Sequence, residues 1–357
     1  MSITFRPLAI ALLGAVLIVS GTALTNRTSA QSPTAASADS TSRIVSAANA
    51  VLASLDDAGR AKVQFPLEGP QKTRWSNLPS PMFQRQGLLL ADLTPAQRTA
   101  VTNLLTTALS RDGYRKVTEI MRGDEVLKTG SGGGGGGRGR GGAGGGPSFG
   151  QDQYYLAFLG TPSTTSPWLL QFGGHHLAIN LTLAGSRASM TPSLPAAQPA
   201  RFTIEGREIR PLGKENDKAF ALINALDATV RGQAILNSRV SDLVLGPGQD
   251  GRVIQPEGAR ASTFTPAQQT MLLELMREWA GIMNDAFAEP RMAELRANLP
   301  QTYFAWSGPT TDGSAAYFRI QGPTLVIEYA PQQGSVDHVH TIYRDPTNDY
   351  GARFVAK

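Results

Sequence analysis

The chain repeats itself, and this repetition constrains its fold more than any other feature. The sequence Thr-Pro-Ala-Gln occurs at residues 94–97 and again at residues 265–268, an offset of 171. Residues 155–160 resemble residues 303–308 at an offset of 148. Internal similarity of this kind predicts one structural unit that is present twice.

The difference between the two offsets coincides with a glycine-rich stretch in the first copy. Residues 130–150 are mostly glycine and carry Arg138 and Arg140, and the second copy has no counterpart. The stretch lacks the Gly-Lys-Ser/Thr of a phosphate-binding loop, so a flexible surface insertion is the better interpretation. We therefore predict a first repeat over residues 43–200, with the glycine-rich insertion at 130–150, and a second repeat over residues 201–357.

Each copy is predicted to begin with helices. Apolar residues recur at helical spacing in residues 44–63 and 220–236. The Thr-Pro-Ala-Gln element then combines an N-cap threonine, a proline at the first helical position and a glutamine that completes a capping box. The helices that it opens are predicted over residues 95–110 and 266–287, and the helical stretches that follow them end near Met121 and Leu299.

Strands follow the helices, because β-rich runs flank a short glycine-containing link in each copy, a pattern typical of hairpins. The links are Gly173-Gly174, between residues 168–172 and 175–183, and Gln321-Gly322, between residues 317–320 and 324–330. Only the second copy shows a clear third strand, residues 339–343. Helices followed by an antiparallel β-meander predict an α+β fold of two pseudo-symmetric repeats, with a ligand site at their seam.

The N-terminus has the composition of an export signal. Arg6 precedes an apolar run over residues 8–24, and the small residues 28–30 resemble a cleavage site. We predict a signal peptide over residues 1–30, a flexible tether over residues 31–42, and an exported, periplasmic or extracellular protein. Because the run is short for a membrane span, contact with a membrane is expected only where this segment stays uncleaved.

Composition narrows the functional classes further. The formal net charge of +5 is too small to predict nucleic-acid binding. The chain has no cysteine, which excludes disulfides and thiol catalysis and leaves its stability to an ordinary core.

Histidine is confined to two short segments. All 4 histidines lie at residues 175–176 and 338–340, and so narrow a placement predicts metal ligation. His338 and His340 share one face of a predicted strand, with Cα atoms about 6.5–7 Å apart. That spacing lets both imidazoles reach one metal ion at about 2 Å.

Strand alternation separates the other two histidines. His176 shares an outward, polar face with Ala178, Asn180 and Thr182, whereas His175 is predicted to lean toward the core or to bond the turn. We predict His176, His338 and His340 as ligands of a divalent metal, zinc or copper, with His175 as a further candidate. In the alternative interpretation, the imidazoles form a buried hydrogen-bond network that locks the seam.

Three further residues are predicted to support chemistry at this site. Glu328 lies on the strand before the histidine strand, and Arg344 and Asp349 follow His340. Glu328 is expected to supply an oxygen, Arg344 to orient an anionic substrate group, and Asp349 to act as a general base or as a partner of a histidine. Residues 343–351 are also rich in turn formers, so a structural turn is the alternative for Arg344 and Asp349.

Three motifs carry a resemblance to a known family. They are Tyr-Tyr-Leu-Ala-Phe-Leu-Gly at residues 154–160, Gly-Gly-His-His-Leu-Ala-Ile-Asn at residues 173–180, and His-Val-His-Thr-Ile-Tyr-Arg-Asp-Pro at residues 338–346. From about Ile44 onward, the chain resembles the DUF3500 family, exported proteins of uncharacterised function. The resemblance supports the histidine site without identifying its chemistry.

The sequence therefore predicts an exported metal-binding protein. The sharper hypothesis is a metalloenzyme that carries out metal-assisted hydrolysis or copper-based oxidation of a small-molecule or anionic substrate. The alternative hypothesis is a non-catalytic periplasmic binding module, which holds a small ligand or an envelope partner in the same cleft.

Overall fold

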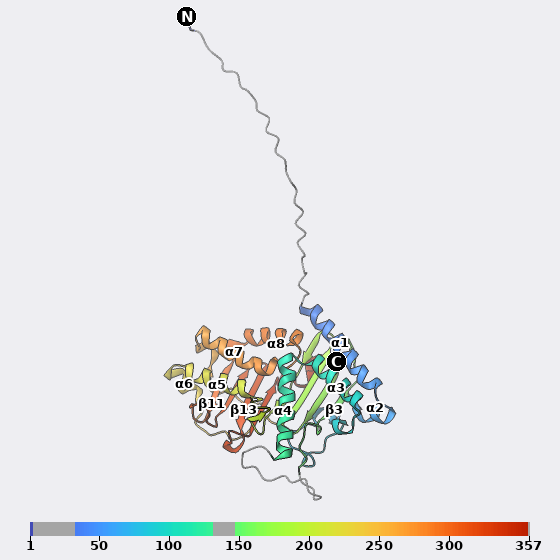
Figure 1. Cartoon of the computed structure of the whole chain (residues 1–357). Coiled ribbons are helices and arrows are strands. Elements are labelled where there is room, and N and C mark those ends of the chain that lie inside the picture. The colour runs from blue at the N-terminus through green and yellow to red at the C-terminus, as the bar shows by residue number, and fades with distance from the viewer. Residues whose placement is uncertain (3–32, 131–146, 356–357) are drawn as a thin grey trace. The chain divides into compact units, whose positions relative to one another are not determined.

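The structure is a computed structural model that describes residues 1–2, 33–130 and 147–355. Apart from its first two residues, the predicted signal peptide lies outside the described residues, and so do residues 131–146 of the predicted glycine-rich insertion. Contacts group residues 32–357 into one unit, and the elements below belong to it (Figure 1). No helix of the described part combines the length and the apolar composition that a membrane span needs.

The described α-helices fall into two groups along the chain. The first group is α1 (Pro33–Ala53), α2 (Asp57–Val63), α3 (Pro95–Ala108) and α4 (Arg111–Thr129). The second group is α5 (Gly213–Ala225), α6 (Ala228–Ala234), α7 (Pro266–Ala280) and α8 (Asp285–Ala297). Short 3-10 turns are η1 (Pro70–Thr73), η2 (Leu90–Asp92), η3 (Ala261–Thr263), η4 (Leu299–Gln301), η5 (Gln332–Gly334) and η6 (Asp349–Phe354).

The described strands form two large sheets and a small hairpin. The first sheet has the order β1 (Gln64–Phe65), β3 (Tyr155–Leu159), β4 (Trp168–Gly174), β5 (Leu177–Ala184) and β6 (Arg187–Ser189), with β2 (Leu88–Leu89) on β3 and β7 (Leu194–Pro195) on β5. The second has the order β10 (Ala259–Arg260), β11 (Tyr303–Ser307), β12 (Tyr317–Gly322), β13 (Leu325–Pro331) and β14 (Val339–Arg344). The hairpin pairs β8 (Phe202–Ile204) with β9 (Arg207–Ile209), and β1 pairs with β3 in parallel. The predicted α+β class is confirmed.

Both predicted capping boxes are present. Thr94 and Thr265 accept hydrogen bonds from the backbone of Gln97 and Gln268, and each glutamine side chain accepts one in return. The amide of Gln97 also donates to Ser54 O at 3.0 Å, and that of Gln268 donates to Ala225 O at 2.8 Å. The caps therefore fix the start of α3 against the end of α1 and the start of α7 against the end of α5.

Several helical predictions need correction, and among them the helix predicted over residues 266–287 ends at Ala280 as α7. Residues 33–42 of the predicted flexible tether instead form the first turns of α1. Ser37, Ser40 and Thr41 are buried there, and Thr41 donates to Gly185 O at 2.7 Å. The stretch predicted to end near Met121 continues as α4 to Thr129, where Gly130 caps it in a left-handed conformation.

The turn between β4 and β5 also differs from the prediction. Gly173 and Gly174 are strand residues, and the link is His175-His176. A Cβ on Gly173 would lie 2.5 Å from Leu177 O, and one on Gly174 would lie 2.6 Å from the Tyr154 ring. The two glycines therefore serve close packing of backbone and ring, and the hairpin reverses two residues later.

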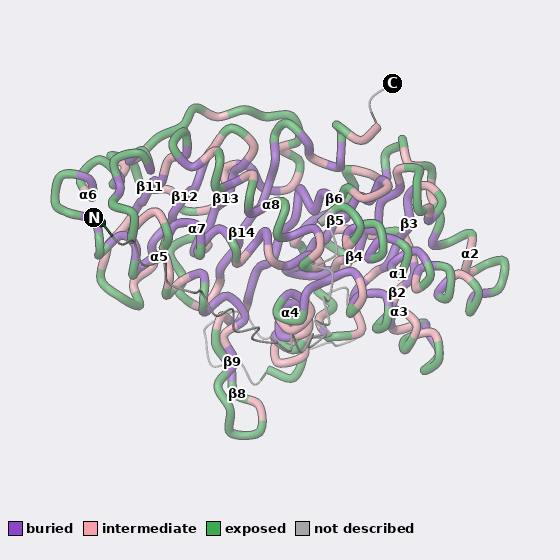
Figure 2. Tube along the Cα trace, turned by 90° about the horizontal axis from the view of Figure 1, so that it is seen from above, coloured by how far each residue is buried: buried purple, intermediate pink, exposed green. Residues whose placement is uncertain are grey.

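A strand-like segment at residues 193–197 joins the two sheets. On one side β7 pairs with β5 through Leu177 and Pro195, and on the other Ser193 and Ala197 bridge Tyr343 and Val339 of β14. Buried strands therefore follow one another from β13 and β14 to β5 and β4 (Figure 2). This junction brings the β4–β5 turn beside the start of β14.

Apolar clusters line both faces of the joined sheets. One packs α1, α3 and α4 on β3–β5, and a second packs α5 and α7 on β11–β13. Met283, just before α8, and Phe287, in its first turn, lie in the predicted second repeat but belong to the first cluster. A third cluster, which includes Trp75, Leu194 and Ile342, lies across the junction. The two predicted repeats therefore share their cores.

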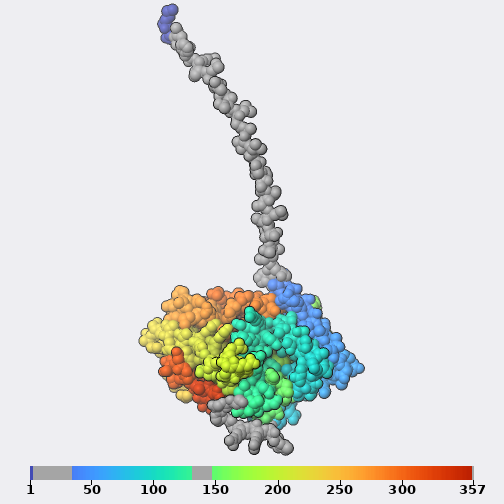
Figure 3. Space-filling model, in the orientation of Figure 1, coloured from blue at the N-terminus to red at the C-terminus, as the bar shows by residue number. Residues whose placement is uncertain are grey.

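Polar contacts of helix α4 link the two predicted repeats. Lys116 pairs with the buried carboxylate of Glu215 and donates to Glu278 O at 2.7 Å. On the face shown in Figure 3, residues near 110–130 lie directly against residues near 200–220.

Candidate metal centre

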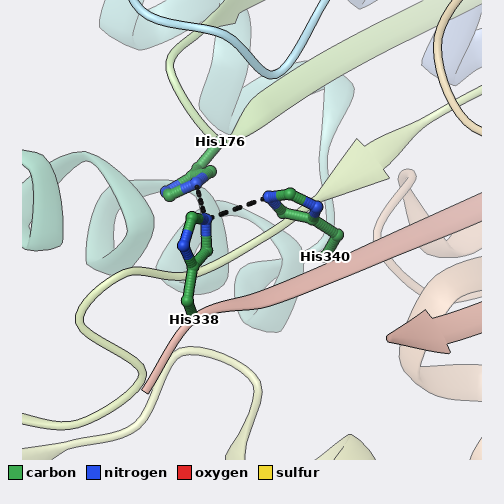
Figure 4. Close-up of side chains that lie close together, drawn as sticks. All are labelled: His176, His338 and His340. Carbon is green, nitrogen blue, oxygen red and sulfur yellow. Dashed lines mark hydrogen bonds between the residues drawn. The ribbon is translucent and has the colours of Figure 1, made fainter. Parts of the chain in front are cut away.

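Three imidazoles from the two predicted repeats meet at the junction (Figure 4). His176 ends the β4–β5 turn, His338 precedes β14 and His340 lies within it. The Nε2 atom of His338 is 2.9 Å from Nε2 of His176 and 3.0 Å from Nε2 of His340. The convergence predicted for His176, His338 and His340 is confirmed as geometry.

The backbone of His176 is held in an uncommon conformation. Its φ is +60°, a value that non-glycine residues seldom adopt. The His176 amide donates to Asn77 O at 3.1 Å, and its carbonyl accepts from Ala196 N at 2.8 Å. Because of this bend, His176 does not face outward as predicted: its side chain is buried and points at His338.

The hydrogen-bonding capacity of these nitrogens does not match their contacts. An imidazole Nε2 carries either one hydrogen or one lone pair, so it makes one good hydrogen bond. His340 Nδ1 lies 2.9 Å from Asp242 Oδ1, and this carboxylate favours the tautomer that leaves a lone pair on His340 Nε2. That nitrogen then faces both the Nδ2 of Asn77 at 3.2 Å and His338 Nε2. His338 Nε2, with two nitrogens close by, completes at most one bond.

Burial and neighbouring imidazoles keep His176 and His338 neutral at neutral pH. Burial and the neighbouring histidines lower the pKa of His176 well below 6.5. Burial, followed by the proximity of His340, lowers the pKa of His338 to about 4. Burial raises the pKa of Asp242, but the interaction with His340 together with hydrogen bonds from Leu243 and Gln332 outweighs it, so the net pKa is lowered. A neutral imidazole is the protonation state that metal ligation needs, and an ionised carboxylate such as Asp242 is a common partner of a ligand histidine.

His175 has a different environment from the other three histidines. Its Nδ1 lies 2.6 Å from Asp124 Oδ1, and its ring stacks on His176 with centroids 3.7 Å apart and planes at 28°. Asp124, His175 and His176 also place one ligand atom each within 4.8 Å. Lone pairs of imidazole lie in the ring plane, so two stacked rings direct them side by side rather than at one point. We therefore favour His176, His338 and His340 as the candidate ligand set, with His175 bonded to Asp124 and stacked on His176.

The family of this protein follows from a comparison with models of known protein families. The family model described as "Protein of unknown function (DUF3500)" matches residues 37–352. The chain belongs to the DUF3500 family. No curated protein and no solved structure matches this DUF3500 chain. Its chemistry therefore has to be argued from its own geometry.

In this DUF3500 protein, the carboxylate of Glu328 bonds to a loop and not to the histidines. Its fully buried carboxylate accepts from Val244 N at 3.0 Å, Leu245 N at 2.7 Å and the hydroxyl of Tyr317 at 2.6 Å. These three donors occupy the oxygens that we expected to face the histidines. Glu328 instead holds the loop that carries Asp242.

Arg344 and Asp349 belong to the same support. Arg344 is buried and donates from Nε to Leu245 O at 2.8 Å and from Nη2 to Gly246 O at 3.1 Å. Its Nη1 lies 3.0 Å from Asp250 and 2.9 Å from Asp349. Asp349 also accepts from Asp345 N at 3.0 Å, as expected for a turn. With these partners, Arg344 does not present a free fork to a substrate, and the turn interpretation is the one that the contacts support.

Sequence reasoning missed Asp242, Asn77 and Asp124. Asp242 and Asn77 lie on loops without a motif, and Asp242 is 98 residues from His340, so no spacing rule relates them. Asp124 carried a usable signal, because it follows the apolar Val117 and Ile120 of the DUF3500 helix α4 at helical spacing. An acid on an apolar helix face needs a buried partner, and here that partner is His175.

Proposed function

We propose that this protein is an exported metal-binding protein in which Nε2 of His176, His338 and His340 holds one divalent ion, zinc or copper. The proposal rests on two distances: Nε2 of His338 lies 2.9 Å from Nε2 of His176 and 3.0 Å from Nε2 of His340. The two close contacts of His338 Nε2 exceed the single hydrogen bond that this atom can make, whereas one cation accepts the lone pairs of all three nitrogens at once.

The separations fit one ion with small movements. Nitrogens bound to one zinc ion at about 2.0–2.1 Å are about 2.9–3.4 Å apart for bond angles of about 90–110°. Asp242 supports this assignment, because it takes the Nδ1 hydrogen of His340 as carboxylates behind metal-bound histidines do. Three histidines leave a coordination position for water or substrate, and such a site supplies Lewis-acid or redox chemistry.

The exposure of residues at the site supports catalysis by the bound ion. His338 is only partly buried, and the side chain of its neighbour Asp242 is 44% exposed. On this basis we propose metal-assisted hydrolysis or copper-based oxidation of a small, anionic or neutral molecule that reaches the site past His338. Asp242 and Asn77, rather than Glu328 or Arg344, are the polar groups that contact the ligand histidines.

A non-catalytic binding module is the second candidate, and one observation favours it. Of the residues that were expected to act on a substrate, Glu328 and Arg344 bond the loop that carries Asp242, and Asp349 pairs with Arg344. Such a module holds the ion, or a ligand through the ion, without turnover.

The proposal also includes export of the protein and an internal duplication of its chain. The apolar run at residues 8–24 supports export through a cleaved signal. The two capping boxes stand 171 residues apart and each glutamine reaches a carbonyl 43 residues earlier, which supports a common origin of the two halves. A site made from both halves fits ligand binding at their seam.

Elemental analysis of the whole protein, purified without a histidine tag and supplemented with zinc or copper, tests the ligand set. We expect about one ion per chain in the wild type and less than about 0.1 in His338→Gln and His340→Gln, because two nitrogens seldom retain zinc or copper. His175→Asn is the matched control: it keeps a donor toward Asp124 and should keep the ion. Metal-free wild-type protein after supplementation would leave the hydrogen-bond network as the correct interpretation.

Turnover separates the enzyme from the binding module. Metal-loaded and chelator-stripped protein are compared on ester and phosphoester hydrolysis and on oxygen-dependent oxidation of phenols. Activity that disappears on stripping, returns with one metal and is absent in His338→Gln supports the enzyme. A loaded protein without turnover in these assays supports the module.

A further inference from the structure

A cavity of about 370 Å³ lies away from the histidines, between α1, α8, the β5–β6 turn and η6. Tyr343 and Asp345 of the β14 end line it, and strand alternation places them on the opposite face from His340 and Arg344. Its size is within the range of small-molecule sites, about 300–1,000 Å³. The cavity is therefore separate from the candidate metal centre.

The cavity has an apolar floor. Met190, Met283 and Phe287 line it and are at most 4% exposed in the folded chain. Phe354 of η6 lines its edge. A ligand that fills this space is expected to place hydrocarbon against these side chains, because burying apolar surface is worth about 25 cal/mol per Å².

The charged side chains of the cavity do not balance. Arg291 pairs with Glu294 at 2.6 Å and with Asp345 at 3.3 Å, and Arg353 pairs with Asp345 at 3.2 Å. Two lining arginines thus stand against two lining acids. A third arginine, Arg187, also lines the cavity. Its Cζ lies 4.9 Å from the centroid of the Phe354 ring, and it has no ion-pair partner among the described residues.

We propose that this cavity binds a small amphipathic organic anion, with its carboxylate at Arg187 and its hydrocarbon body against Met190, Met283 and Phe287. Arg187 is the cation that the neighbouring acids leave uncompensated, and its cation–π contact with Phe354 holds the guanidinium at the cavity edge. The apolar floor supplies affinity for the body and the arginine selects the charged head. This site does not depend on the metal proposed above.

Calorimetric titration of the full chain with octanoate tests the proposal, with octanol as the uncharged analogue and inorganic phosphate as a head group without a chain. We expect octanoate to bind at least about tenfold more tightly than octanol or phosphate, the effect of one charge-assisted hydrogen bond. Arg187→Gln should lower the octanoate affinity about tenfold, and Arg187→Lys should restore part of it.

Arg207→Gln is the matched control, since Arg207 is exposed on β9 and does not line the cavity. It removes the same charge and should leave octanoate binding unchanged. Equal effects of Arg187→Gln and Arg207→Gln, equal binding of octanol, phosphate and octanoate, or no binding would overturn the proposal. A loss of octanoate binding in His338→Gln as large as that in Arg187→Gln would place the anion on the metal instead, and would also overturn it.

Discussion

His340 presents its Nδ1 to Asp242 at 2.9 Å and its Nε2 to His338 at 3.0 Å, so one ring connects a carboxylate to the imidazole cluster. The carboxylate lies on a loop and the ring on β14, and Glu328 holds that loop in place through two backbone amides. The arrangement makes the geometry of His340 depend on residues that do not touch the proposed ion.

Removal of the Asp242 carboxylate is expected to weaken metal binding. Asp242→Ala should lower the affinity for zinc by about 10–100-fold, because the ring of His340 loses its orientation and some of its basicity. Competition with a chromophoric chelator measures this affinity. Asp312→Asn, an exposed carboxylate elsewhere, should leave the affinity unchanged, and an equal loss in both variants would contradict the role of Asp242.

Loss of the Glu328 carboxylate is expected to destabilise the fold as well as the site. In Glu328→Gln an amide group replaces one oxygen, so at least one of the Val244, Leu245 and Tyr317 donors loses its acceptor. We expect the free energy of unfolding in urea to fall by about 1.5–3 kcal/mol, the range for hydrogen bonds to a charged group. Glu274→Gln, on the exposed side of α7, is the control and should change it by less than about 0.5 kcal/mol.

Acid is expected to destabilise the metal-free protein through the histidine cluster. His176 and His338 have lower pKa values in the folded state than the unfolded value of about 6.5, so the unfolded chain binds their protons first. Their contribution to stability is therefore present above about pH 6.5 and is lost as the pH falls toward the His338 pKa of about 4.

Urea unfolding of chelator-treated protein at several pH values between 7 and 4.5 measures this loss. For His338, whose partial exposure reduces the effect, we expect about 2 kcal/mol over this range. His338→Gln should show a smaller decline than the wild type. Identical pH profiles for the two proteins would show that His338 titrates normally.

The glycines before the histidine turn are expected to be intolerant of a side chain. A Cβ in Gly173→Ala would meet Leu177 O at 2.5 Å, and the backbone on both sides is fixed by the β4–β5 ladder. We expect a loss of about 1–3 kcal/mol in the free energy of unfolding, the usual cost of overpacking, together with weaker metal binding. Gly232→Ala in α6 meets nothing within 4 Å and should instead stabilise by about 0.5–1 kcal/mol. Similar stabilities for the two variants would refute this account of the turn.

Several elements were predictable because their signals are local. The Thr94 and Thr265 caps form as predicted, since the residues that bond are three positions apart. The strands β4, β12, β13 and β14 lie where alternation and β-rich composition indicate them. The hairpin turn was misplaced because Gly173 and Gly174 satisfy a packing need with Tyr154 and Leu177, which belong to other parts of the sheet.

The candidate site was predictable only in its histidines. Their restriction to two segments pointed to a shared site, but Asp242, Asn77 and Asp124 reach it from loops and a helix far along the chain. The same limitation misassigned Glu328 and Arg344. Glutamate and arginine are residue types that often act on substrates, and only the hydrogen-bond partners of Glu328 and Arg344 show that these two residues hold a loop.

The sequence alone determined the starts of α3 and α7, the strand pattern and the family, because caps, alternation and motifs act over a few neighbouring residues. The tertiary structure decided that nitrogens of His176 and His338, 162 residues apart, come within 2.9 Å. That distance depends on residues 193–197, which pair with β5 on one side and β14 on the other. Backbone pairing between distant segments is set by the packing of the whole core, and no local pattern encodes it.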